Sequence, residues 1–126
     1  MKNFGLEFRY LKTENTAETK FINELEKFLK RKFIRQYPVK EVGLRTRVDA
    51  FDPSTNSIYE FLGDYWHGNL EVFDPTKINE STKTSFYELN AKTFIRLNKL
   101  KDLGYKVHYI WESDFLKSKF LNLFTL

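Results

Sequence analysis

The chain has 126 residues, a formal net charge of +4 and a pI near 9.2. This length suits a single domain of residues 1–126, with residues 1–14 as an N-terminal arm or strand. The absence of cysteine excludes disulfides and thiolate zinc sites. No apolar run reaches membrane-spanning length and the N-terminus is no signal peptide, so we expect a soluble, cytoplasmic protein with no membrane partner. The basic charge fits a polyanionic partner, as well as many ordinary basic proteins.

The first patterned segment is helical. Asn15, with Glu18 three residues later, forms a capping-box pattern, and apolar residues at helical spacing predict a helix to about Lys32. At about 100° per residue, Glu18 projects onto the apolar face, whereas Glu24 lies to its side. An inward acid here either pairs with the Asn15 cap or supports an interior site, with Glu24 as the alternative acid.

Three strands are predicted next. Residues 33–39 form the first, and alternating apolar residues at 46–50 and 58–62 predict a hairpin. Residues 52–56 supply the turn between them, because an Asp-Pro pair favours turns. Asp52 is therefore expected to be a plain turn residue.

The hairpin would bring two acids together. Antiparallel strands place Asp49 near Glu60, and the Phe61 carbonyl is expected to be available at the strand edge. Two carboxylates, one carbonyl and waters suit Mg²⁺, which prefers oxygen ligands. Alternatively, Asp49 forms a surface salt bridge and Glu60 is an ordinary exposed strand residue.

Residues 64–69 follow between two glycines and are predicted to form a loop. His67 lies a few residues past the acids, within reach to act as a base toward a water molecule. Tyr65 and Trp66 supply flat rings suited to stacking, although a tryptophan is more often part of a core.

The rest of the chain predicts a loop at 77–84, a helix at 86–103, a strand at 105–112 and a last helix capped by Asp114. Thr93 falls in the middle of the apolar face of the long helix, where its hydroxyl could bond to the carbonyl one turn earlier. The order helix, three strands, helix, strand, helix indicates an α/β fold with a mixed sheet flanked by helices.

Several of these segments carry a family resemblance. The run from Glu60 to His67 (EFLGDYWH), the segments LGYKV and IWE at 103–107 and 110–112, and their order after Val48 and Asp49 resemble the very-short-patch repair endonucleases. They also resemble the related small phage homing endonucleases of the PD-(D/E)XK nuclease superfamily, more closely around GDYWHGN. The likeness covers residues 15–112.

The resemblance implies a restriction-endonuclease-like αβββαβ core and Mg²⁺-dependent hydrolysis of DNA phosphodiester bonds, with Mn²⁺ able to substitute and no nucleotide cofactor. It implies metal ligation by Asp49, Glu60 and Phe61, a catalytic His67, and Glu18 as an acid that binds metal-bound waters. Double-stranded DNA is the expected partner, with a homodimer if both strands are cut. The expected DNA-binding residues are the aromatic wedge and two groups of cations, those beside Asp49 and those on the flank of the long helix: Tyr65, Trp66, Arg45, Arg47, Lys92 and Arg96.

The sequence departs from the family pattern at three positions. Leu62 occupies the place of the superfamily's lysine, whereas Glu60 restores an acid that the repair enzymes lack. Thr93 stands where those enzymes carry an aspartate that pairs with the histidine, so Asp64 is the expected orienting partner of His67. These departures leave two alternatives: a junction- or flap-resolving nuclease on the same fold, or a non-catalytic DNA-binding module that retains it.

Overall fold

The computed structural model describes residues 16–40 and 46–117. The predicted N-terminal arm, Asn15, Arg45 and the end of the last predicted helix lie outside these residues. The chain divides into two compact units, Met1–Lys32 and Phe33–Leu126. No helix among the described residues has both the length and the apolar character needed to cross a membrane.

The N-terminal unit contains helix α2 (Ala17–Leu29). The predicted cap at Asn15 is wrong by one residue: Thr16 is the N-cap, and its hydroxyl accepts a hydrogen bond from the Thr19 amide at 3.2 Å. Threonine serves this role because its side-chain oxygen satisfies an amide that has no partner within the helix. Glu18 lies half-buried in the first turn, and Glu24 is exposed.

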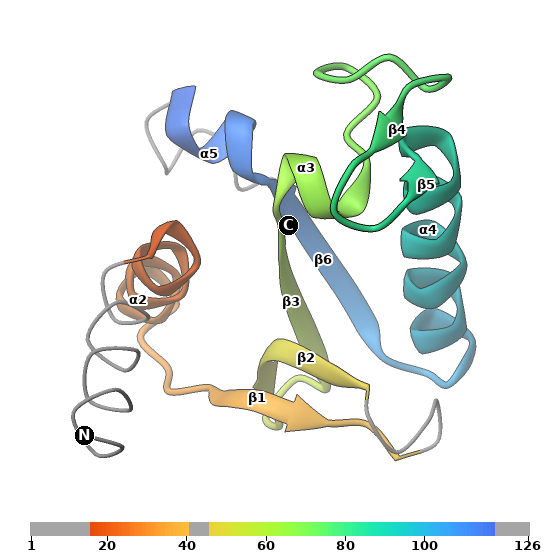
Figure 1. Cartoon of the computed structure of the whole chain (residues 1–126). Coiled ribbons are helices and arrows are strands. Elements are labelled where there is room, and N and C mark those ends of the chain that lie inside the picture. The colour runs from red at the N-terminus through yellow and green to blue at the C-terminus, as the bar shows by residue number, and fades with distance from the viewer. Residues whose placement is uncertain (1–15, 41–45, 118–126) are drawn as a thin grey trace, which may run out of the picture. The chain divides into compact units, whose positions relative to one another are not determined.

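The second unit contains a mixed four-stranded sheet flanked by helices, which confirms the predicted α/β class (Figure 1). The strand order is β1-β2-β3-β6, with β1, β2 and β3 antiparallel and β6 parallel to β3. The strand bounds are β1 (Ile34–Pro38), β2 (Arg47–Asp52), β3 (Ser57–Leu62) and β6 (Lys106–Trp111). All four agree with the predicted strands to within a few residues.

The hairpin turn is held by Asp52. Its carboxylate accepts hydrogen bonds from the amide and hydroxyl of Ser54, at 3.0 and 2.7 Å, and from the Thr55 hydroxyl. Asn56 adopts the left-handed conformation that an asparagine tolerates well in turns. The prediction that Asp52 is a turn residue is confirmed.

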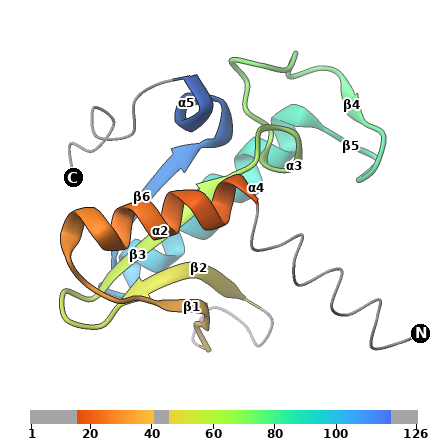
Figure 2. The ribbon, with the colours of Figure 1, turned by 90° about the vertical axis from the view of Figure 1, so that its left-hand side faces the viewer.

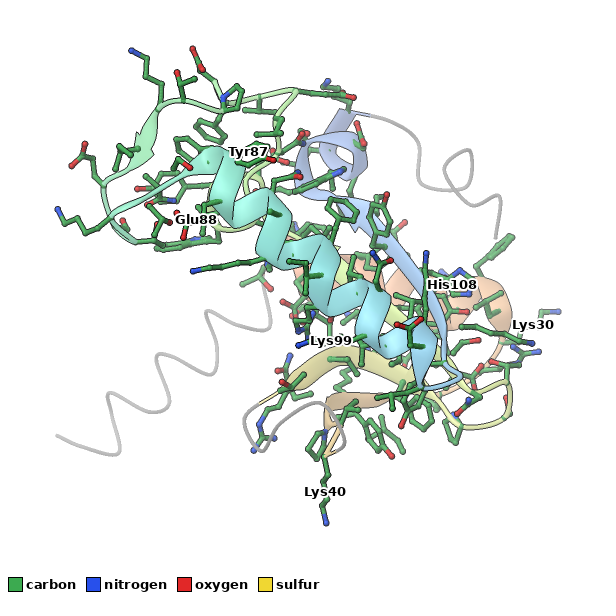
Figure 3. The ribbon with its side chains drawn as sticks, turned by 90° about the vertical axis from the view of Figure 1, so that its right-hand side faces the viewer. Lys30, Lys40, Tyr87, Glu88, Lys99 and His108 are labelled. Atoms are coloured by element: carbon green, nitrogen blue, oxygen red, sulfur yellow. The ribbon has the colours of Figure 1, made fainter. Side chains whose placement is uncertain are left out.

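Helix α4 (Phe86–Asp102) connects β3 to β6 and lies along one face of the sheet (Figures 1 and 2). Its buried residues include Thr93, Leu97 and Leu100, which recur at the spacing of one helix face. Tyr87, Glu88 and Lys99 lie on its exposed side (Figure 3). The core between helix and sheet contains Val39, Val48, Phe51, Ile58, Leu62, Leu97 and Leu100.

Three predicted segments differ from the structure. Residues 64–69 are not a loop: they contain the short helix α3 (Asp64–His67), which Gly68 ends at φ +70°. The predicted loop at 77–84 contains a small hairpin of β4 (Ile78–Asn79) and β5 (Thr84–Ser85). The last helix, α5 (Glu112–Lys117), begins at Glu112, so Asp114 lies in its first turn and is not its cap.

Candidate active site at the strand fork

Strands β2 and β3 separate halfway along their length. Their pairing runs from Asp52–Ser57 to Ala50–Tyr59 and stops there. Beyond this point β2 stays paired with β1, while β3 stays paired with β6 as far as Leu62. We call this point of divergence the strand fork (Figure 1). It places the first unpaired residues of the two strands, Asp49 and Glu60, opposite each other.

The carboxylates of the two acids accept hydrogen bonds across the strand fork. The Asp49 amide donates to Oε2 of Glu60 at 2.8 Å, and the Phe61 amide donates to Oδ2 of Asp49 at 2.7 Å. Each carboxylate thus accepts from the backbone of the opposite strand, in place of the ladder bonds that end at Ala50 and Tyr59. The predicted proximity of Asp49 and Glu60 is confirmed. Because Glu60 is only 3% exposed, the alternative of an exposed strand residue is wrong.

The structure also places the Phe61 backbone at the strand fork. Because β2 and β3 are paired only as far as Ala50 and Tyr59, the side of β3 that faces β2 is an unpaired strand edge at Phe61. In an extended strand the N–H and C=O of one residue point to the same side. Because the Phe61 amide donates to Asp49, its carbonyl also faces the strand fork. A backbone oxygen at this strand edge is therefore directed toward the two carboxylates.

Arg96 is the functional residue whose place sequence reasoning missed. It was assigned to the flank of the helix, as a DNA contact. Instead Nη1 forms an ion pair with Oε1 of Glu60, and Nη2 donates to the Arg47 carbonyl at 2.7 Å. The sequence spacing could have indicated this position, because Arg96 follows the buried Thr93 by three residues and residues at that spacing share a helix face.

His67 is oriented by Thr93 and not by Asp64 as predicted. His67 Nδ1 lies 3.1 Å from the Thr93 hydroxyl, which also lies 3.4 Å from the His67 carbonyl. Asp64 points elsewhere: its Oδ1 accepts from Asn69 Nδ2 at 2.9 Å and from the Ser113 hydroxyl at 3.2 Å. Asp64 thus joins α3 to α5, and the half-buried imidazole is oriented by a neutral hydroxyl.

The charge of His67 follows from its surroundings. Burial lowers the pKa of His67, and the positive charge of Arg96 lowers it further. Since both effects hold this pKa below its ordinary value of 6.5, the neutral ring predominates at neutral pH. A neutral imidazole is the form that accepts a proton.

The lowered pKa predicts a dependence of stability on pH. The unfolded chain protonates His67 near its ordinary pKa of 6.5, whereas the folded protein does so only at lower pH. The free energy of unfolding should therefore fall as pH falls from above 6.5 toward the folded-state pKa.

Urea unfolding at about pH 7.5 and about pH 5.5 measures this effect. His67→Gln should show a smaller fall than wild type. His108→Gln is the comparison for a histidine outside the site. Burial also lowers the pKa of His108, which stacks on Tyr59, so this variant shows how much of the fall the other histidine contributes. An equal fall in wild type and His67→Gln would contradict a lowered His67 pKa.

The two predicted wedge residues have different surroundings. Trp66 is 58% exposed, so the alternative that it belongs to the core is wrong. Tyr65 packs against Phe73 and Phe86, and its hydroxyl lies 3.0 Å from that of Ser81. Trp66 contacts the edge of the Tyr65 ring and is the more exposed of the two rings.

The other predicted residues have contacts of their own. Lys92 is exposed and forms an ion pair with Glu88 at 3.6 Å. Arg47 is exposed and donates to the Gln36 carbonyl at 3.3 Å. Glu18 belongs to the N-terminal unit, and its role stays a prediction.

The oxygen ligands at the strand fork suit a hard divalent cation. Asp49, Glu60 and the Phe61 carbonyl offer carboxylate and carbonyl oxygens, and Mg²⁺ commonly takes one or two carboxylates and keeps several waters. Within residues 16–40 and 46–117, no three His, Cys, Asp or Glu side chains gather around one point. A cation here would thus depend on two acids, backbone and water. Comparisons of the chain with protein-family models, curated proteins and solved structures found no match.

Proposed function

We propose that this chain is a Mg²⁺-dependent endonuclease that hydrolyses phosphodiester bonds of double-stranded DNA. The observation that carries the proposal is the strand fork, where Asp49 and Glu60 come together beside a backbone carbonyl. Two acids that each accept from the opposite strand are held in a fixed geometry. Fixed oxygen ligands are what a catalytic cation site requires.

In this proposal Asp49, Glu60 and the Phe61 carbonyl hold the cation, and Mn²⁺ can replace Mg²⁺. A bound Mg²⁺ would lower the pKa of a water molecule and neutralise charge on the phosphate. Carboxylate and carbonyl oxygens favour this metal over a softer one.

His67 acts as the general base. The Thr93 hydroxyl has one hydrogen, and the contact with the His67 carbonyl uses it, so Nδ1–H is the donor to Thr93. This tautomer leaves the Nε2 lone pair to accept a proton from the attacking water. The lowered pKa of His67 keeps Nε2 unprotonated at neutral pH.

We assign DNA binding to exposed cations and to an exposed aromatic ring. Arg47 and Lys92 are exposed cations that suit phosphate contacts, and Arg45 precedes them in the chain. Trp66 offers a ring that can stack on bases or enter between them. The resemblance to repair and homing endonucleases supports this assignment, and a homing-type or nicking enzyme is the form we favour.

A second function is favoured by one specific observation. Arg96 already neutralises Glu60, and Leu62 is buried in the core where the superfamily has a lysine. These two features suit a DNA-binding module that keeps the fold without cutting.

A plasmid-nicking assay separates the two functions. The purified protein should nick or linearise supercoiled DNA with Mg²⁺ or Mn²⁺, and EDTA should stop it. His67→Ala should lower the rate by about 100-fold, the usual contribution of a general base. DNA binding without cleavage under all of these conditions would replace the enzyme with the binding module. If the protein cuts DNA, comparison of its cleavage of linear, mismatched and branched substrates would identify the target.

A further inference from the structure

Arg96 bridges the two strands of the fork. Its guanidinium is ion-paired with Glu60 on β3 and donates to the Arg47 carbonyl on β2. The carboxylate and the carbonyl thus each receive one arm of a planar group that offers several donors. The arginine side chain is 27% exposed and the Glu60 side chain 4%. Arg96 therefore extends from solvent to a buried carboxylate.

Glu60 needs this partner in the absence of metal. A buried carboxylate is costly unless a counter-charge and hydrogen bonds compensate for its lost hydration. Leu62, which lies two residues later on the same face of β3, cannot supply charge. The guanidinium supplies it from α4, one turn beyond the Thr93 that orients His67.

A divalent cation would supply the same compensation. If it bound Glu60 while Arg96 stayed in place, two positive groups would share one carboxylate at close range, and they would repel each other in a partly buried site. Because the arginine side chain is partly exposed, it can move toward solvent without unfolding the helix. There its planar fork suits phosphate oxygens.

We propose that Arg96 competes with the divalent cation for Glu60, and that cation binding releases its guanidinium toward the DNA phosphate. The proposal rests on the proposed cation site at the strand fork. It makes Arg96 a positioning residue for Glu60 before the metal binds and a phosphate contact afterwards.

Calorimetric titration of Mg²⁺ into Arg96→Gln tests the competition. Removal of the competitor should tighten Mg²⁺ binding by about tenfold, within the range typical of coupled sites. Cleavage at saturating Mg²⁺ should nevertheless fall, because the phosphate contact is lost. Lys101→Gln is the matched control: it removes the same charge from an exposed position on the same helix, and it should leave the Mg²⁺ affinity unchanged.

Thermal unfolding gives a second measurement. Without metal, Arg96→Gln should be less stable than wild type, because Glu60 loses its counter-charge. Addition of Mg²⁺ should stabilise the variant more than wild type, since the cation would compensate the Glu60 charge that the guanidinium compensates in wild type. Equal affinity and equal stabilisation in the two proteins would overturn the competition.

The wild-type protein supplies a third measurement that is independent of how the variant folds. NMR signals of the Arg96 guanidinium should change from a bound to a solvent-exchanging state as Mg²⁺ is added, together with the Asp49 and Phe61 amides. Shifts of these amides with an unchanged guanidinium would overturn the competition alone. No Mg²⁺-dependent change in any of these groups would overturn the proposed cation site as well.

Discussion

Asp49→Asn should reduce Mg²⁺-dependent DNA cleavage by about 1,000-fold, the equivalent of about 4 kcal/mol in the barrier. The substitution removes one negative charge from the strand fork but keeps the size of the side chain. The asparagine oxygen can still accept from the Phe61 amide, so the fork should stay intact. The loss is therefore expected in activity and in Mg²⁺ affinity, and little of it in the free energy of unfolding.

Asp102→Asn is the control for this change. Asp102 is the last residue of α4 and is exposed, so the same acid-to-amide replacement occurs away from the strand fork. We expect wild-type cleavage from it. If Asp49→Asn cut plasmid DNA as fast as Asp102→Asn, the acids of the fork would have no part in the reaction.

Gly68→Ala should lower the free energy of unfolding by about 4 kcal/mol, through backbone strain and overpacking together. Gly68 ends α3 at φ +70°, and a methyl group there would lie 2.3 Å from the Phe86 carbonyl and 2.7 Å from the Asn90 nitrogen. The glycine thus allows α3 to approach the first turn of α4. This approach sets His67 against Thr93, so the His67 pKa should also move back toward its ordinary value.

Gly104→Ala separates strain from collision. Gly104 also has a positive φ, +102°, but a methyl group there would have no atom within 4 Å. We expect a loss of about 2 kcal/mol from backbone strain alone. Chemical denaturation of both variants measures the difference, and NMR titration of His67 measures its pKa. Equal losses in the two variants would show that the added methyl group at Gly68 meets no steric conflict with α4.

The sequence was sufficient for the parts of the fold that depend on local periodicity. Alternation predicted β2 and β3, and the turn chemistry of Asp52 predicted their register closely enough to pair Asp49 with Glu60. The apolar spacing of α4 correctly placed Thr93 on its buried face. Each of these inferences involves residues that are close in sequence or joined by one tight turn.

The errors came from contacts between distant segments. Asp64 was expected to orient His67, but Ser113, far along the chain, binds its carboxylate. Thr93 was not expected to orient His67, because a hydroxyl lacks the charge of an aspartate. Its position next to the imidazole decides its role instead. Such pairings depend on how α3, α4 and α5 meet, which a periodic pattern does not specify.

Arg96 illustrates the same limit within one helix. Spacing places Arg96 close to Thr93 and Leu97, yet Arg96 was assigned to the helix flank as a cation for DNA phosphates. The buried Glu60 reverses this assignment, because an unpaired carboxylate would cost more than bringing in the arginine. The ion pair can be predicted only when the packing of the sheet places Glu60 next to α4.

Paramagnetic broadening by Mn²⁺ tests the central claim most directly, because it locates the cation without requiring cleavage. Traces of Mn²⁺ added to the wild-type protein should broaden the NMR signals of the Asp49 and Phe61 amides and of the His67 ring. Asp49→Asn and Glu60→Gln should each remove this effect. Broadening that persists in both variants, or that centres on other acids such as Glu80 and Glu88, would contradict a cation site at the strand fork.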